Sequence, residues 1–353
     1  MKFMVGYQMR PSGDFLDEIL RRKNQIYEVY FSWGSFASGR GTMFQNMDMT
    51  EWEVQTRQAE DLRTLSRAGI PLNLLFNGNC YGRESQSRAF FNRVGQTVDS
   101  LNSRFGLQSI TTSSPLIAKF IKNNFPSLKT RASVNMGIGT CQGMDYVSEY
   151  FDEFYLQREQ NRSLEAIMVL RDWCRENGKE LFALANSGCL NYCSAHTFHD
   201  NLVAHEAEIA AMDNAYDFPG VCRDYVRQPE KRISLIRDVS FIRPEDVPLY
   251  EGLFPALKLA TRVSAAPSRI LRAYCEGKYV GSILGLLEPD HTALLYPELL
   301  ENSLFPEDFG ERVLHCEKKC AECGYCAKVY RSTCVRLPSE PTVGIEPIDN
   351  RKG

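Results

Sequence analysis

The chain has 353 residues, a formal net charge of −3 at pH 7, 43% hydrophobic residues and 24% charged residues. These proportions are typical of a soluble globular protein, long enough for one large domain or for one domain with a small appendage. The net charge excludes a global basic field that would favour nucleic acid. No apolar run approaches the roughly 18 residues that a membrane helix needs, so we expect no membrane partner.

The first residues, MKFMVGYQMRPSGDF, contain a short apolar stretch that no small-residue cleavage site follows. This pattern predicts a first β-strand rather than a signal peptide, and hence a cytoplasmic protein. Thiols stay reduced in the cytoplasm, so clustered cysteines indicate metal binding or catalysis rather than disulfides.

Short β-rich runs then alternate with amphipathic stretches. Strands are expected at 2–8, 27–33, 71–77, 108–114, 130–136, 153–157, 180–186, 233–242 and 256–261. Helices are expected at 50–68, 86–105, 114–124, 144–151 and 163–177. Thr50 and Glu53 are spaced as a capping box at the start of the first of these helices. Such alternation predicts a parallel sheet with helical crossovers.

Seven or eight such units favour a closed (β/α)8 barrel of the TIM type, with a doubly wound open α/β sheet as the alternative. No GxGxxG or GxxxxGK[ST] loop follows a strand, which argues against a Rossmann or P-loop fold. We expect the barrel to span residues 1–285 and a small Cys-rich C-terminal extension and tail to span 286–353. The last residues, RLPSEPTVGIEPIDNRKG, predict an extended strap or a disordered end.

The positions after the expected strands are rich in amides and poor in carboxylates. They are Gln8, Arg10, Ser32, Trp33, Asn77, Asn79, Cys80, Thr112, Ser113, Asn135, Gln157, Arg158, Glu159, Asn186, Ser187 and Cys189. Function in a (β/α)8 barrel resides at these strand ends, and neutral amides can orient a polar substrate without supplying acid or base. The four asparagines are therefore candidate substrate-binding residues. The plainer interpretation is that Asn and Ser favour turns after strands.

One dense segment of cysteine and histidine, ANSGCLNYCSAHTFHDNLVAHE, spans residues 185–206 after the seventh strand. Cys189 and Cys193 precede His196 and His199, and zinc is the simplest metal for such a set of ligands. Cys222, which follows a Pro-containing loop, is a candidate long-range ligand beside the first two cysteines.

A second dense segment, HCEKKCAECGYCAKVYRSTC, spans residues 315–334. Its candidate metal ligands are Cys316, Cys320, Cys323 and Cys326. Short gaps of this kind resemble iron–sulfur ligation, whereas zinc ribbons usually separate two cysteine pairs by a longer spacer. The order differs from that of ferredoxins, and zinc remains the alternative.

The blocks LLFNGNCYG, SVNMGIGT, FYLQREQNRSLEAI, LANSGCLNYCSAHTFHDN and VSFIRPEDVPLYEGLFPALKLATRV resemble the peptidase U32 family, the collagenase-like proteases. The resemblance covers roughly residues 1–285. Several members of this family look like iron–sulfur proteins that hydroxylate tRNA, ribosomal RNA or quinone precursors without oxygen. In those members, cysteines after a late barrel strand, together with later cysteines, hold a [4Fe–4S] cluster.

Carried over to this chain, the resemblance implies that Cys189, Cys193 and Cys222 hold such a cluster. The spacing differs from that of the better-known members, and the tail cysteines are an addition that many members lack. A tail cysteine folding back over the barrel would supply the fourth ligand, or the tail would hold a second cluster. The resemblance also implies a paired homologous subunit or an electron donor as partner.

The first functional hypothesis is an iron–sulfur enzyme that performs oxygen-independent hydroxylation, or another redox or lyase step, on a small molecule or an RNA base. Its candidate catalytic residues are Glu159, His199 and Arg158. Arg10 and Arg243 join the asparagines as candidate substrate-binding residues, because arginine binds carboxylate or phosphate in a bidentate manner.

Two alternatives belong to other classes. A hydrolase would need a zinc-bound water or a reactive cysteine, but no Ser–His–Asp or Cys–His arrangement can be read from the sequence. A non-catalytic RNA-binding protein with a structural metal would use the aromatic runs YEVYFSW and EYFDEFY, although such periodic aromatics are more often core.

Overall fold

In the computed structural model, which describes residues 1–10, 12–40 and 49–337, eight parallel strands close into a barrel. Neighbouring strands follow chain order, and β1 pairs with both β2 and β8. The strands are β1 (Lys2–Gly6), β2 (Ile26–Phe31), β3 (Leu72–Phe76), β4 (Leu107–Thr112), β5 (Lys129–Ala132), β6 (Glu153–Tyr155), β7 (Glu180–Leu184) and β8 (Ala256–Leu259). The predicted (β/α)8 barrel is thus confirmed, and the open sheet is excluded.

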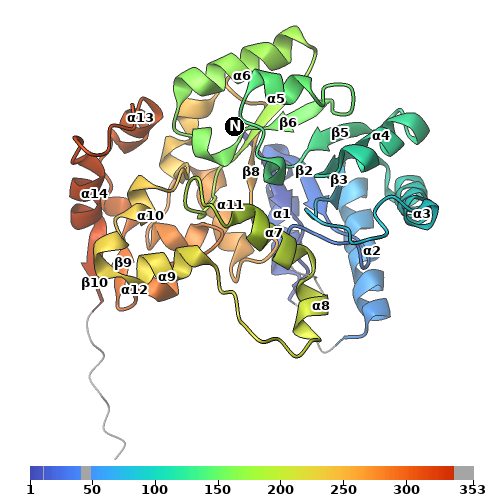
Figure 1. The fold of residues 1–353 in the computed structure, drawn as a ribbon, viewed down its shortest axis with the longest axis horizontal. Coiled ribbons are helices and arrows are strands. Elements are labelled where there is room, and N and C mark those ends of the chain that lie inside the picture. Colours follow the sequence, from blue (N-terminus) through green and yellow to red (C-terminus); the bar gives the residue numbers. More distant parts are fainter. Residues whose placement is uncertain (11, 41–48, 338–353) are drawn as a thin grey trace, which may run out of the picture.

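Helices connect the successive strands and cover the barrel from outside (Figure 1). Up to β7 they are α1 (Asp14–Arg21), α2 (Glu51–Arg67), α3 (Arg88–Phe105), α4 (Pro115–Asn124), α5 (Cys141–Asp145) and α6 (Leu164–Glu176). Both halves of the predicted capping box are present, since the Thr50 side chain accepts from Glu53 N and the Glu53 carboxylate accepts from Thr50 N.

One expected helix is shifted. The helix expected at 144–151 begins instead at Cys141, because the Thr140 hydroxyl accepts a hydrogen bond from Gly143 N and caps the chain there. Cys141 is therefore the first residue of this helix. Cys174 lies in α6 with 1% exposure, a burial typical of a structural thiol.

The expected strand at 233–242 is wrong. Its first half forms α10 (Ser234–Arg237), and the rest is irregular. Main-chain oxygens that would bond to a neighbouring strand accept hydrogen bonds from a buried side chain instead. Arg162 donates to Ile236 O at 2.7 Å and to Phe241 O at 3.3 Å. Since the barrel closes with the other eight strands, no sheet edge remains for this segment to join.

The connection from β7 to β8 is long and carries α7 (His196–Ala204), α8 (Glu206–Ala210), α9 (Val221–Arg227) and α10. After β8 come α11 (Pro267–Glu276), α12 (Thr292–Leu295), β9 (Glu298–Leu300), α13 (Phe309–Leu314), α14 (Tyr325–Thr333) and β10 (Cys334–Arg336). β9 and β10 form a small antiparallel sheet. This last part of the chain packs beside α9 and α10, at the left of Figure 1.

Side chains alternate between the barrel interior and the helices, as the pleat of a strand requires. The interior holds a buried ion-pair network in which Arg131, 1% exposed, donates to Glu153 at 2.7 Å and to Glu28 at 3.0 Å. Asn73 donates to Glu28 at 3.1 Å. These polar side chains pack together with the apolar Met4 and Phe182, which contact Arg131 inside the barrel.

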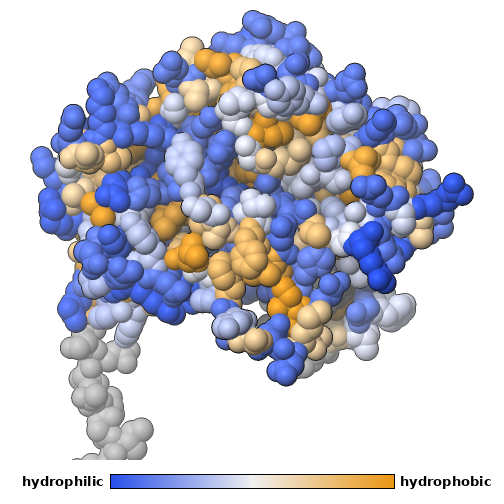
Figure 2. Space-filling model, viewed as in Figure 1, coloured by the Kyte–Doolittle hydropathy of each residue, from blue (hydrophilic) through white to orange (hydrophobic). Residues whose placement is uncertain are grey.

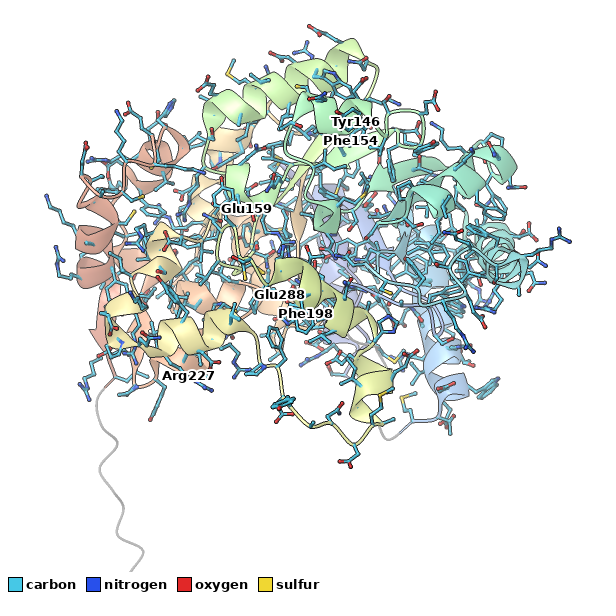
Figure 3. All side chains as sticks on the ribbon, viewed as in Figure 1. Tyr146, Phe154, Glu159, Phe198, Arg227 and Glu288 are labelled. Carbon is cyan, nitrogen blue, oxygen red and sulfur yellow. The ribbon has the colours of Figure 1, made fainter. Side chains whose placement is uncertain are left out.

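Within the described ranges, no helix has the length and apolar character to cross a bilayer. Figure 2 shows apolar side chains near the middle and lower part of the viewed face. Phe198 of α7, which is 55% exposed, is labelled there in Figure 3. The residues of the predicted strap from 338 onward lie outside the described part of the chain.

Candidate functional site at the open end of the barrel

A narrow cavity lies at the C-terminal ends of the strands, where (β/α)8 barrels carry their sites. Its lining residues are Tyr30, Gly39, Arg40, Asn77, Val134, Asn135, Leu184, Lys258, Ala260, Arg262, Val263 and Glu288. Among the described lining residues, Arg40, Lys258 and Arg262 are cations, and Glu288 is the single acidic residue. The cavity therefore carries a surplus of positive charge.

Lys258 is the most deeply buried of these cations. Its side chain projects from β8 into the barrel, and the residue is 6% exposed. The ammonium nitrogen lies 4.4 Å from the ring centre of Tyr30 and 4.7 Å from that of Tyr155. Burial lowers the pKa of Lys258 to about 7, helped by Arg262 and Arg131 and opposed by Glu28. Among the described residues, no carboxylate forms an ion pair with this amine.

The two arginines approach from loops above Lys258. Arg40 Nε lies 2.7 Å from the Glu288 carboxylate, and Arg262 Nη1 donates to the Ser38 hydroxyl at 2.9 Å. Burial lowers the pKa of Arg262 to about 10. Gly6 makes room for this arrangement, because a Cβ at that position would lie 2.6 Å from Arg262 Cγ.

Two of the four predicted asparagines line the cavity. Asn77 accepts hydrogen bonds from Gly39 N at 3.2 Å and from the Ser38 hydroxyl at 3.3 Å. Asn135 lies beside it and accepts from Arg158 at 3.5 Å. Both amides are therefore positioned to contact a small molecule at the mouth.

The other two asparagines make different contacts. Asn79 donates to Asp200 of α7 at 3.3 Å. Asn186 is fully buried and bonds main-chain atoms of Ala260 and Leu286, so it ties β7 to β8 and to the later chain.

The predicted arginines divide in the same way. Arg158, 4% exposed, reaches the cavity rim through Asn135. Arg10 donates to the main-chain oxygen of Ala265, and Arg243 forms a bidentate ion pair with Asp246 at 2.7 and 2.8 Å. The structure does not bring Arg10 or Arg243 into the lining of the mouth cavity.

Glu159 lies between the barrel and the Cys-rich tail. Its carboxylate accepts from Tyr192 N at 3.4 Å, and its main-chain oxygen accepts from Lys318 Nζ at 3.0 Å. Figure 3 places Glu159 and Glu288 in the central part of the molecule, beside α7.

The three cysteines predicted after β7 form one group. Burial raises the pKa of the Cys222 thiol, and Cys189 and Cys193 raise it further, so these two thiols lie within electrostatic range of Cys222. A Cβ at Gly220 would lie 3.6 Å from both Cys222 Sγ and His199 Cε1, so His199 adjoins this group. His196 is turned toward Asp200, at 3.2 Å.

The four predicted tail cysteines form a second group, with three of them in the loop after α13 and Cys326 in the first turn of α14. Burial raises the pKa of Cys326, Arg162 opposes this, and the neighbouring Cys316, Cys320 and Cys323 raise it further. Cys334 stands apart, beside Glu298 at the β9–β10 sheet.

The two cysteine groups adjoin each other through Lys318. This residue lies between Cys316 and Cys320 in the chain, and its ammonium lies 5.7 Å from the ring centre of Tyr192, which lies between Cys189 and Cys193. The tail therefore folds back onto the loop that follows β7.

The donor type suits an iron–sulfur cluster, because thiolates are its usual ligands and each group gathers at least three thiols. In the part of the chain that the structure describes, no three His, Cys, Asp or Glu side chains converge at metal-binding distance. The cysteines are thus neighbours rather than a preassembled coordination shell, and cluster binding would have to draw them together.

The structure also assembles a Cys–His–Glu arrangement that sequence reasoning did not find. Cys80 follows β3, and the neighbouring His205 lowers its pKa, helped by the main-chain N–H of Gly82, which donates to Cys80 Sγ at 3.4 Å. Cys80 in turn raises the pKa of His205, whose Nδ1 lies 3.0 Å from the Glu208 carboxylate. His205 and Glu208 line a large cleft beside the barrel.

Sequence reasoning also missed Arg40, Lys258, Arg262 and Glu288. The sequence did contain a signal for Lys258, since ALKLA places one lysine inside an otherwise apolar strand. Arg262 lies on the same face four residues later. Arg40 and Glu288 lie in loops, and nothing in their local pattern distinguishes them.

The fold and the cavity define a TIM-barrel protein with a polar, cationic site at the strand ends. No known protein-family model matches the chain. The uncharacterized protease MJ1657 of Methanocaldococcus jannaschii is 24% identical over 322 residues, which cover 87% of this chain and 88% of the relative.

Among solved structures, the U32 peptidase Mk0906 matches with a TM-score of 0.52 and 14% identity, over 73% of this chain and 91% of that chain. At that identity the match supports the fold alone. The resemblance to U32 proteins expected from the sequence is thus matched by the fold of a U32 peptidase, and the curated relative is described as a protease.

Proposed function

We propose that the chain is an iron–sulfur enzyme of the U32 type that acts on a substrate bound at the mouth of the barrel. Its chemistry is oxygen-independent hydroxylation or another redox or lyase step on a small molecule or an RNA base. The observation that carries this proposal is the adjacency of the two cysteine groups, joined by Lys318, at the end of the barrel where the cavity opens.

Cys189, Cys193 and Cys222 would hold a [4Fe–4S] cluster, which supplies one-electron redox or Lewis-acid chemistry when bound. His199 or a tail cysteine would provide the fourth ligand. Cys316, Cys320, Cys323 and Cys326 would hold a second cluster or close the first. Hydroxylation without O2 removes two electrons from the substrate and takes its oxygen from water, so the proposal includes an external electron acceptor; a reductive step would use an external electron donor instead.

The chain's own residues bind and orient the substrate. Asn77 and Asn135 offer amide groups at the cavity wall, and Arg158 holds Asn135 in place. Glu159, 6% exposed, lies beside the loop of Cys189 and Cys193 and is the candidate proton-transfer group.

The test is anaerobic purification followed by iron, zinc and acid-labile sulfide analysis and a visible spectrum. About four irons with matching sulfide support one cluster, and about eight support one in each cysteine group. Zinc without sulfide would overturn the redox proposal.

A second candidate is a cysteine hydrolase, favoured by Cys80, His205 and Glu208. A histidine beside a thiol and oriented by a carboxylate activates that thiol for attack on an ester or amide carbonyl. The description of the Methanocaldococcus jannaschii relative as a protease agrees with this role.

This candidate is tested with peptide and ester substrates on wild type and on Cys80→Ala. Hydrolysis that Cys80→Ala abolishes and Cys141→Ala retains would establish it. Activity retained by Cys80→Ala would exclude this thiol as the nucleophile. Cys141 is a suitable control because it is half-buried and remote from the histidine.

A further inference from the structure

We propose that the mouth cavity is a binding site for one small oxyanion, a carboxylate or phosphate group, held by Arg40, Lys258 and Arg262. This inference deepens the proposed function, on which it rests only for the identification of the cavity as the substrate site.

The charges around the cavity are not balanced. Glu288 is paired with Arg40 through the 2.7 Å contact. Arg262 bonds a neutral hydroxyl, and Lys258 contacts only aromatic ring faces among its described neighbours. Burying cations without counter-charges is unfavourable, so a bound anion would supply the missing charge.

The other charged groups near Lys258 do not remove this surplus. Arg131 and Glu28 face it from the layer below, where Arg131 is already bonded to two carboxylates. Lys129 also pairs with Glu153, at 3.1 Å, so two cations balance the two carboxylates of that layer without Lys258. The imbalance is confined to the cavity, on the side that opens toward the strand ends.

The shape of the site favours a small group over a macromolecule. Lys258 is 6% exposed, below a rim formed by Asn77 and Asn135. The phosphate of a nucleic-acid backbone, with its flanking sugars, cannot reach so deep a cation. A terminal carboxylate or phosphate of a small molecule can, and the two amides would bond the adjacent part of that molecule.

The site adjoins the first cysteine group. Gly188, the residue before Cys189, donates its N–H to Glu288 O at 2.7 Å, and the Glu288 carboxylate pairs with Arg40, so the loop of Cys189 lies beside the cavity. An anion held by Arg40 and Lys258 would therefore anchor the substrate with its other end toward the sulfurs that follow β7.

The experiment is isothermal titration calorimetry of the full chain with inorganic phosphate and, separately, with malonate, at pH 7. We expect saturable binding of at least one of the two anions, and the stronger of them identifies the preferred oxyanion. Lys258→Met and Arg262→Met should each weaken binding about tenfold or more. Lys122→Met, at the opposite end of the barrel beside Asp152, is the matched control and should bind like wild type.

Binding that survives both Lys258→Met and Arg262→Met, or the absence of binding by wild type, would overturn the proposal. Preference for an RNA oligonucleotide over both small anions, sensitive to the same substitutions, would also overturn it. Iron content measured on the same samples separates the two proposals. Anion binding without iron leaves this one standing, whereas iron without anion binding leaves only the proposed function.

Discussion

The ammonium nitrogen of Lys318 lies 3.0 Å from the main-chain oxygen of Glu159, and this contact fastens the Cys-rich tail loop to the open end of the barrel. Lys318→Met should loosen the loop, because it removes a charge-assisted hydrogen bond worth about 1 kcal/mol. We expect amide hydrogen exchange over residues 315–324 to accelerate about fivefold, measured by mass spectrometry.

Lys319→Met is the matched control, since that lysine is 68% exposed and pairs only with Glu317 in the described structure. Equal acceleration in the two variants would contradict a fastening role for Lys318.

Lys258 predicts a specific dependence of stability on pH. Its folded pKa of about 7 lies below the ordinary value of 10.5, so between these values the unfolded chain binds more protons and stability rises with pH. Lys258→Met should therefore have a higher free energy of unfolding than wild type at pH 6, by about 2 to 4 kcal/mol as measured by urea unfolding. This difference should shrink toward pH 10. A pH-independent difference would argue against a buried charged amine.

Arg131 should be required for the barrel interior. Arg131→Met leaves Glu28 and Glu153, each 2% exposed, without their common cation, and should lower the free energy of unfolding by about 3 to 5 kcal/mol. Arg227→Met, which removes an exposed pair with Asp224, should cost less than about 1 kcal/mol. Urea unfolding at pH 7 measures both, and similar losses would refute the network's role.

Metal content should follow the cysteine groups. Cys189→Ser or Cys193→Ser should remove the iron and sulfide held by Cys189, Cys193 and Cys222, together with any activity that depends on that iron. Cys174→Ser should leave metal content unchanged, because that thiol is buried in α6 against Met144. Loss of iron in the Cys174 variant would show that the ligands are assigned wrongly.

Cys80 should react with iodoacetamide at lower pH than an ordinary thiol, because His205 lowers its pKa. His205→Phe removes the imidazole and should slow alkylation of Cys80 at pH 7 about tenfold, followed by peptide mass spectrometry. His315→Phe, which removes only a contact of His315 with Glu311, should have no effect on this rate. Unchanged alkylation in His205→Phe would exclude activation by the histidine.

Local sequence patterns were sufficient for most of the fold. The eight barrel strands and α2 with its capping box follow from periodicity and spacing. The segment 233–242 misled because its apolar side chains are buried in the core, while two of its main-chain oxygens bond Arg162 rather than a neighbouring strand. An apolar run in the sequence predicts burial, but it does not predict which groups form hydrogen bonds with the main chain there.

The sequence by itself determined the barrel class, the two groups of clustered cysteines and the amides at the strand ends, because these features depend on neighbours along the chain. Only the tertiary structure decided that Arg40 and Glu288 meet above Lys258, and that Cys80 meets His205. Closure of the barrel brings loops from distant parts of the chain to one end, and no local periodicity records which of their side chains then share a cavity.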